Sequence, residues 1–238
     1  MARMRVFAGP NGSGKTTLNA SLQGQFNFGV YLNPDDLYQA IAAAGRLDLA
    51  RYGINANVLS WADFQQNHSL VKVLRSDEAL VTAPGNTLCF SRTPSVYMVS
   101  IVIDYLRHLL LEAERTFSFE TVFSHESKVR LMEKASSKGY RTYLYFVCTS
   151  SPEINVFRVQ QRRQEGGHDV PEKKIRSRYS RSLQNLTAGI RIAYRTYLFD
   201  NSGMESSLVG EITPKRELHL FKSSIPVWVE KHVLPIFK

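Results

Sequence analysis

Short apolar runs alternate with amphipathic stretches along most of the chain. This alternation predicts an α/β fold in which helices cover a mostly parallel five-stranded sheet. The apolar runs expected to form its strands are 4–8, 30–32, 116–121, 140–149 and 194–199. The stretches expected to form helices around them are 15–22, 127–138, 151–166 and 169–189. Two strand-like pieces, 207–211 and 217–221, and a final helix predict a C-terminal extension over about 204–238.

The segment 41–114 departs from this alternation. It holds about 75 residues, whereas the crossover between two parallel strands needs about 30. Its last part, from Val99 to Leu110, places apolar residues at helical spacing. Turn-forming residues at 83–86 and 92–95 predict loops. We therefore expect a single domain over 1–238 that carries a helical insertion at about 41–114.

The composition of the 238 residues, 43% hydrophobic and 21% charged, is typical of a globular enzyme. No apolar run approaches the ~18 residues that a membrane-spanning helix needs, so we expect no membrane partner. Met1–Arg5 leads directly into the first predicted strand, which leaves no room for a signal peptide. Cys89 and Cys148 lie far apart and outside any metal-binding spacing. These features predict a cytoplasmic protein with reduced thiols.

The strongest chemical motif lies between the first predicted strand and the first predicted helix. It reads Gly, four residues, Gly-Lys-Thr, and comprises Gly9, Pro10, Asn11, Gly12, Ser13, Gly14, Lys15, Thr16 and Thr17. Such a loop curls its backbone N–H groups around phosphate oxygens at a helix N-terminus. The Lys15 ammonium suits the β- and γ-phosphates of a nucleotide, and the Thr16 hydroxyl suits Mg²⁺. The motif predicts a nucleoside triphosphate and Mg²⁺ as cofactors.

Polar residues follow three of the predicted strands, at the edge of a parallel sheet where ligands bind. They are Asp35 and Asp36, Glu120, and Asn201. A phosphoryl-transfer enzyme needs a base for the acceptor hydroxyl, and Asp35 suits that role as well as contact with the metal. Asn201 is expected at the nucleotide, and the expected acceptor-binding residues are Asn33, Asp35, Asp36, Glu120 and Thr121. The structural alternative is that Asp35 or Asp36 only caps a helix and Glu120 is a surface residue.

Basic residues concentrate between Arg158 and Arg195. This stretch contains ten lysines and arginines and three acidic residues, so its net charge is +7, compared with +9 for the whole chain. Arg158 and Arg162 lie one helical turn apart and share a face, and Arg178 on the next helix can converge with them. Arginine binds phosphate through a planar, permanently charged fork, so we expect these three to clamp the triphosphate. A solvated helix face or nucleic acid is the alternative reading of the basic stretch.

With these residues identified, the chain resembles the zeta toxin family of P-loop kinases, in particular its compact bacterial branch described as predicted ATPases. The resemblance covers about 1–40 and 115–203. Its most specific part is the stretch Gly166-Gly167-His168-Asp169-Val170-Pro171, preceded by the Arg158–Arg162 helix. The runs Asn33-Pro34-Asp35 and Asp200-Asn201-Ser202 match the family as well.

The resemblance implies a P-loop kinase-like three-layer fold and transfer of a phosphoryl group from ATP to a small hydroxyl acceptor. The best-known toxins of the family phosphorylate UDP-N-acetylglucosamine and are held in check by an antitoxin. The family's catalytic aspartate corresponds to Asp35, its P-loop lysine to Lys15 and its strand-end glutamate to Glu120. Its phosphate-clamping arginines correspond to Arg158, Arg162 and Arg178.

Two departures from the family bear on the acceptor. The insertion has no counterpart in the best-known toxins, and their Glu-Gly-Thr pattern is Glu120-Thr121-Val122 here. UDP-N-acetylglucosamine is therefore only a candidate acceptor. The chain also starts at the first predicted strand, without the extra N-terminal helix of many toxins, so an antitoxin is only a candidate partner.

Two other functions remain open from the sequence. One is a nucleotide-gated ATPase or binding protein that signals through the insertion, although the chain lacks a separate strand aspartate of the Walker B type. The other is a nucleic-acid end kinase, which depends on the basic stretch alone. Single-strand readers interleave aromatic and basic residues, and this stretch does not, so we do not expect nucleic acid as a partner.

Overall fold

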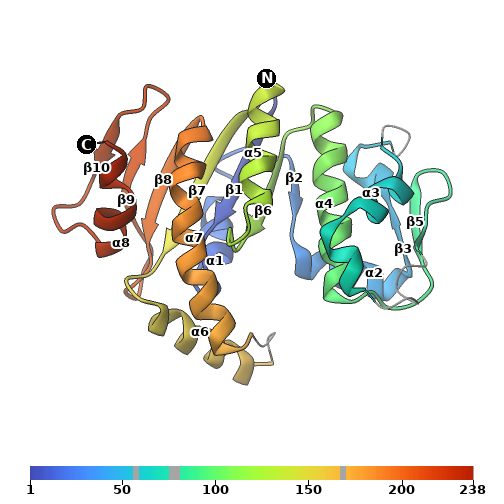
Figure 1. Cartoon of the computed structure of the whole chain (residues 1–238), viewed down its shortest axis with the longest axis horizontal. Helices are drawn as coiled ribbons and strands as arrows, with labels where there is room; N and C mark the ends of the chain where they lie inside the picture. The colour runs from blue at the N-terminus through green and yellow to red at the C-terminus, as the bar shows by residue number, and fades with distance from the viewer. Residues whose placement is uncertain (56–58, 75–80, 167–169, 238) are drawn as a thin grey trace. The chain divides into compact units, whose positions relative to one another are not determined.

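The computed structural model describes residues 1–55, 59–74, 81–166 and 170–237 (Figure 1). The chain divides into two units. The first unit contains Met1–Phe28 and Ser118–Lys238, and the second contains Gly29–Phe117. The strand Val30–Leu32, which we placed ahead of the insertion, groups with the insertion in the second unit, as does the helix that follows it.

A mainly parallel sheet forms the centre of the first unit and confirms the predicted fold class (Figure 1). The strand order within this unit is β10-β9-β8-β7-β1-β6. Strand β1 pairs in parallel with β7, and β7 with β8, whereas β9 and β10 are added antiparallel. The strands span Arg3–Ala8 (β1), Phe117–Thr121 (β6), Arg141–Cys148 (β7), Arg195–Asp200 (β8), Ser207–Ile212 (β9) and Leu218–Leu220 (β10).

Strand β7 is apolar from Tyr143 to Cys148, and it is buried on both faces from Leu144 onward. On one face the ring of Tyr145 stacks between Phe7 and Tyr197, with centroids 4.8 and 5.1 Å away. On the other face Phe146 lies against Trp228, with ring centroids 5.8 Å apart. The strand is thus fixed on both sides, and the loops at its carboxyl end start from a rigid base.

The helices of the first unit follow the predicted order. They span Lys15–Leu22 (α1), Ser127–Ser137 (α5), Pro152–Gln164 (α6), Glu172–Ile192 (α7) and Val227–His232 (α8), with a 3-10 turn at Leu234–Ile236. Helix α7 continues three residues beyond Gly189, where we expected it to end. A Cβ at Gly189 would lie 3.0 Å from the Phe123 ring. This glycine therefore allows close packing within a helix instead of ending one.

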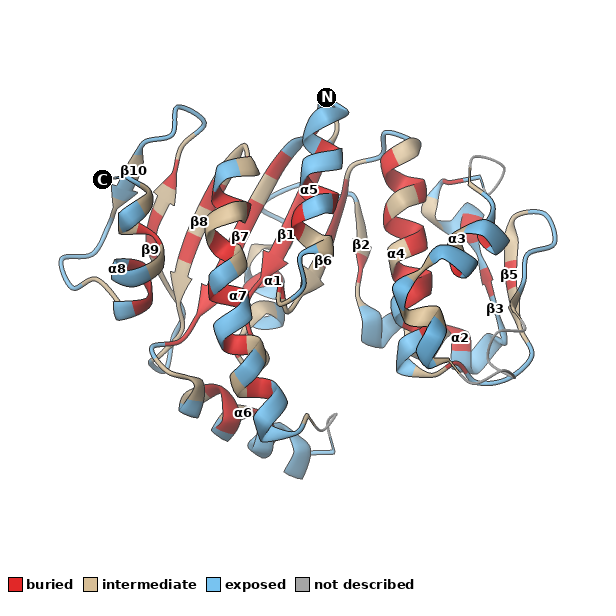
Figure 2. Ribbon diagram, in the orientation of Figure 1, coloured by how far each residue is buried: buried red, intermediate tan, exposed pale blue. Residues whose placement is uncertain are grey.

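The second unit contains the helices α2 (Pro34–Ala44), α3 (Trp61–Asn67) and α4 (Val96–Glu112), with α4 mostly buried (Figure 2). Its polar side chains tie the segments together: the Tyr105 hydroxyl donates to the Leu59 carbonyl at 2.6 Å. In addition to helices, the unit contains a small antiparallel sheet that we did not predict. Its strands are too short to show an alternating pattern; they are β3 (Arg46–Asp48), β5 (Thr87–Phe90) and β4 (Val81–Thr82). The unit also has the strand β2 (Val30–Leu32) and 3-10 turns at Leu49–Tyr52 and Ser69–Val73.

Among the described helices, none combines the length and the apolar character that crossing a membrane requires.

Candidate active site

The predicted phosphate-binding loop joins β1 to α1. Gly9 has φ 148°, and a Cβ there would lie 2.0 Å from the Val147 carbonyl oxygen of β7. Gly14 has φ 93°, and a Cβ there would meet the Asn201 side-chain nitrogen at 2.1 Å. Only glycine allows this close approach, so the loop is held directly against the carboxyl ends of β7 and β8. The residues thus form the tight cradle that a phosphate group requires.

Two asparagines from other elements fix the backbone of the loop. The Asn155 amide of α6 donates to the Asn11 carbonyl at 2.5 Å. The Asn201 amide donates to the Ser13 carbonyl at 2.8 Å. Asn201 was expected at the nucleotide, and its side chain acts here on the loop itself. Asn155 was missed, although a polar residue among the buried positions of α6 was the signal that could have found it.

The Ser13 hydroxyl is buried in the loop and has no hydrogen-bond partner within the described part of the chain. A buried hydroxyl without a partner costs free energy. A ligand oxygen in the cradle would remove that cost. The side-chain chemistry and the backbone of the loop therefore both fit a phosphate group.

Lys15 and Thr16 begin α1 and lie near Glu120 of β6. The Lys15 ammonium donates to the Pro10 carbonyl at 2.9 Å, and the Thr16 hydroxyl donates to Glu120 Oε2 at 2.8 Å. Burial lowers the pKa of Lys15 to about 8, Glu120 opposes this shift, and Arg162 and Arg178 add to it. The lysine therefore loses its proton more readily than usual. A bound anion would favour its charged form.

Two of the three predicted clamp arginines act electrostatically on the loop. Arg178 of α7 donates to Asn11 Oδ1 at 3.2 Å. The positive charges of Arg178 and Arg162 both depress the pKa of Lys15. The first unit thus gathers three cationic side chains around one phosphate-binding loop, which favours a polyanionic ligand.

Arg158 has other contacts. Its guanidinium donates to the carbonyl oxygens of Asn201 at 2.7 Å and Gly203 at 3.0 Å, beyond the end of β8. These bonds attach the middle of α6 to the segment after β8. The two carbonyl groups lie 43 and 45 residues away along the chain, so no local sequence pattern predicts these contacts.

Arg176, another arginine of the basic stretch, has acidic partners. It pairs with Glu153 at 2.5 Å and with Glu172 at 2.8 Å, which joins the start of α6 to the start of α7. Its hydrogen bond lowers the pKa of Glu153 to about 2. Arg176 thus forms part of the surface ion pairs of the two helices. In the predicted Gly-Gly-His-Asp-Val-Pro motif, Gly167, His168 and Asp169 lie outside the described residues.

The predicted base lies in the second unit, in the first turn of α2. Asn33 is the residue that caps this helix: its Oδ1 accepts the Asp35 N–H at 2.8 Å. Asp35 and Asp36 are exposed, and neither supplies the cap. The capping role that we considered for these two carboxylates is therefore filled by Asn33.

Thr121 ends β6 next to Glu120 and shapes the turn that follows. Its hydroxyl accepts the Phe123 N–H at 3.1 Å, and Phe123 has a positive φ of 61°. Phe123 is fully buried, and its carbonyl accepts the Asn185 amide at 2.9 Å. The turn after β6 is thus fixed to α7, which keeps Glu120 in place near Thr16.

The oxygen atoms of Thr16 and Glu120 are of the kind that Mg²⁺ prefers. Over 1–55, 59–74, 81–166 and 170–237, no group of three or more His, Cys, Asp or Glu side chains could hold a metal ion. A P-loop does not need one, because the nucleotide phosphates supply further ligands. The residues present therefore fit a magnesium ion that binds together with a nucleotide.

No family model matches the chain. A curated protein of Haemophilus influenzae, described as uncharacterized, is 28% identical over 74 residues. The match covers 31% of this chain and 53% of that protein, or about half its length.

Three solved structures have similar folds. A chain of the AvrRxo1-ORF1:AvrRxo1-ORF2 complex with sulphate ions has a TM-score of 0.57 at 16% identity, over 94% of this chain and 62% of that one. A chain of the same complex solved with ATP has a TM-score of 0.56 at 15% identity, over 93% of this chain and 61% of that one. A chain of the PezAT toxin–antitoxin system of Streptococcus pneumoniae has a TM-score of 0.54 at 14% identity, over 96% of this chain and 75% of that one. This chain thus spans less than two thirds of the AvrRxo1 chains.

At these identities the likeness concerns the fold. It agrees with the resemblance inferred from the cradle, the strand-end acids and the arginine helices. The chain shares the α/β fold of these solved structures, in agreement with the P-loop kinase-like fold that its resemblance to the zeta toxin family implies.

Proposed function

We propose that the protein is a Mg²⁺/ATP-dependent kinase that transfers the γ-phosphoryl group to a hydroxyl of a small acceptor. The observation that carries the proposal is the phosphate-binding loop, where Lys15, Arg162 and Arg178 interact and Thr16 contacts Glu120. A loop with this charge suits a triphosphate better than a single phosphate group. A structure of a protein with a similar fold contains ATP, which supports adenine as the nucleobase of the nucleotide.

In this proposal the backbone N–H groups of the loop and Lys15 hold the β- and γ-phosphates, and Arg162 and Arg178 neutralise their charge. Thr16 and Asp35 would hold Mg²⁺, with Glu120 acting through water or on the acceptor. When bound, the ion would neutralise the charge shared between the phosphates. Arg158, which we first assigned to the phosphate clamp, would also hold the Asn201–Gly203 segment beside the nucleotide.

Asp35 is the proposed general base. Its carboxylate would accept the proton of the acceptor hydroxyl as that oxygen bonds to the γ-phosphorus. The bond to the bridging oxygen breaks, and ADP leaves. The exposed position of Asp35, with the cap left to Asn33, supports this assignment. Asn33, Asp36 and Thr121 would help to bind the acceptor.

We further propose a nucleotide sugar as the acceptor, with UDP-N-acetylglucosamine as the first candidate. This rests on the family resemblance, and the Glu120-Thr121-Val122 departure limits it to a candidate. Two of the similar folds come from a protein complex and a toxin–antitoxin system. An antitoxin is for this reason a candidate protein partner.

The experiment incubates purified protein with ATP, Mg²⁺ and a panel of nucleotide sugars, followed by mass spectrometry. A phosphorylated sugar that is absent with Asp35→Asn would establish the proposal. Release of free phosphate with every panel member unchanged would instead favour the nucleotide-gated ATPase. In that case a metabolite extract replaces the panel.

A further inference from the structure

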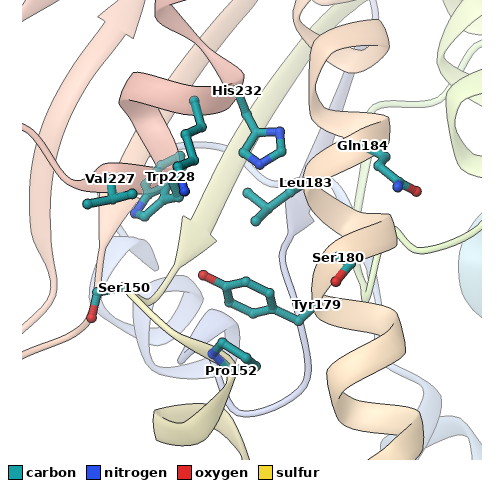
Figure 3. Close-up of a pocket in the computed structure, with 10 residues that line it drawn as sticks. Ser150, Pro152, Tyr179, Ser180, Leu183, Gln184, Val227, Trp228 and His232 are labelled. Atoms are coloured by element: carbon teal, nitrogen blue, oxygen red, sulfur yellow. The ribbon is translucent and has the colours of Figure 1, made fainter.

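A pocket of about 310 Å³ lies in the first unit, away from the phosphate-binding loop (Figure 3). Tyr179 and Leu183 project into it from α7, and Trp228 and His232 border it from α8. The turn between β7 and α6 closes its lower side with Ser150. This volume is at the lower end of the range for small-molecule sites. It is large enough for one or two fused rings and too small for a nucleotide.

The floor of the pocket is aromatic and rigid. Tyr179 and Trp228 are 8% and 2% exposed, so their rings are fixed by packing. The Tyr179 hydroxyl donates to the Thr149 carbonyl at 2.7 Å, and the Trp228 indole N–H donates to Asp200 Oδ2 at 2.9 Å. With their polar atoms engaged and their rings almost fully buried, the two residues form a fixed base, and the exposed apolar surface of the pocket includes Val227, which is 51% exposed.

The charge of the pocket selects an anion. Ten residues line it, and Lys231 is the one with a permanent charge; none of the ten is acidic. Burial and the neighbouring Lys231 lower the pKa of His232, so this side chain is neutral at pH 7 and can act as a hydrogen-bond partner. The Asp200 carboxylate accepts hydrogen bonds from the Trp228 indole N–H and from the Ser202 N–H and hydroxyl.

We propose that this pocket is a second ligand site, which binds a small planar organic anion of the aromatic carboxylate class. The ring would lie against Val227 and the accessible part of the Tyr179 ring, with Trp228 behind them. The carboxylate would pair with Lys231, and the hydroxyls of Ser150 and Ser180 border the same space. Nothing in the phosphoryl-transfer proposal uses these side chains, and the two proposals stand independently.

The wall of this pocket also connects with the phosphate-binding loop. Tyr179 bonds to the Thr149 carbonyl, and the Thr149 hydroxyl donates to the Asn155 side chain. Asn155 in turn donates to the Asn11 carbonyl. The neighbour of Tyr179 on α7, Arg178, bonds directly to Asn11 as well. Occupation of the pocket would stabilise the elements that hold the loop.

The test uses fluorine NMR of the full chain labelled with 5-fluorotryptophan. The chain has two tryptophans, so Trp228 reports on the pocket and Trp61, in the second unit, is the internal control. The probes are 2-naphthoate, quinoline-2-carboxylate and indole-3-carboxylate, each compared with its neutral amide. We expect a saturable shift of the Trp228 resonance with at least one acid, and binding at least about fivefold weaker for its amide.

Two variants sharpen the test. Lys231→Met keeps the side-chain length, and because Lys231 is exposed the fold should persist. This variant should lower the affinity for the acid to that for the amide. Ser180→Phe, also at an exposed lining position, should block acid and amide alike. An unchanged Trp61 resonance and melting temperature would show that both variants fold.

The proposal is overturned if no acid binds at up to ~5 mM, or if acid and amide bind equally. An unchanged acid affinity in Lys231→Met would also overturn it. Displacement of the acid by saturating ADP would show that the pocket is not a separate site. None of these readouts requires phosphoryl transfer, so failure here leaves the kinase proposal intact, and an inactive kinase leaves this one intact.

Discussion

The two units present their functional side chains in different ways. In the first unit the phosphate-binding loop is fixed from β7, α6 and the end of β8, and the side chains of Lys15 and Thr16 already have partners. In the second unit the carboxylates of Asp35 and Asp36 lie exposed on the first turn of α2. Because the phosphate site lies in one unit and the candidate base in the other, we expect nucleotide binding and proton transfer to be separable. Each can be removed while the other remains.

The largest effect should come from Asp35→Asn. Removal of a general base costs about 10²–10⁴-fold in rate, and the amide keeps the shape of the side chain. We expect phosphoryl transfer to fall by that amount while the Kd for ATP changes less than about twofold. Asp36→Asn, one residue further along the same turn, is the matched comparison: because Asp36 is proposed only to bind the acceptor, this variant should raise the KM for the acceptor and leave kcat largely unchanged. Equal losses in the two variants would contradict the assignment of the base to Asp35.

Arg178→Met should affect the nucleotide side. It removes a charge and the hydrogen bond to Asn11, and bonds to charged groups contribute about 1.5–3 kcal/mol. We expect kcat/KM for ATP to fall about 10–100-fold, with the Asp35 step unaffected. Arg181→Met, at an exposed position three residues further along α7, is the control. If both variants behave like the unaltered protein, the arginine does not bind phosphate.

The pH dependence of ATP binding should reveal Lys15. Its pKa in the free protein is about 8, and the protonated form binds phosphate better. Affinity should therefore be highest below pH 8 and fall by up to about tenfold per unit as pH rises above it. Binding near pH 8 should take up a proton, which calorimetry in buffers of different ionisation enthalpy measures. Lys15→Met should bind weakly at every pH; a pH-independent Kd in the unaltered protein would refute the role of this lysine.

The smallest effect should come from Tyr179→Phe, which removes one hydroxyl and leaves the Thr149 carbonyl without that donor. We expect about 1 kcal/mol lower free energy of unfolding, read from the denaturant midpoint. ATP affinity should fall by no more than about threefold. A loss as large as that of Arg178→Met would mean that the bond from Tyr179 to Thr149 supports the loop as strongly as the direct contact of Arg178.

The sequence predicted the first unit well because its strands and caps are local signals. The apolar run of β7, the glycine-rich loop and the proline at the start of α6 each specify their structure within a few residues. The small sheet β3-β5-β4 was missed because two- to four-residue strands carry no periodicity. Gly189 was taken for a helix end because a sequence does not show which ring packs against it.

The same distinction holds for the candidate site. The residue types of the loop and the strand-end acids follow from known phosphate chemistry and were predicted. The partners of Arg158, the support that Asn155 provides to Asn11, and the bond from Tyr179 to Thr149 depend on contacts between distant elements. Such contacts arise from packing, which no single-sequence pattern encodes. The roles assigned to individual site residues stay predictions until they are measured.

The most direct test of the central claim follows the γ-phosphoryl group itself. ATP radiolabelled at the γ-phosphate is incubated with Mg²⁺, the protein and a small-molecule extract that includes nucleotide sugars, with Asp35→Asn in parallel. The account predicts label in an organic product that phosphatase treatment releases, and no such product with the variant. Label found only in inorganic phosphate, at equal rates for both proteins, would contradict it.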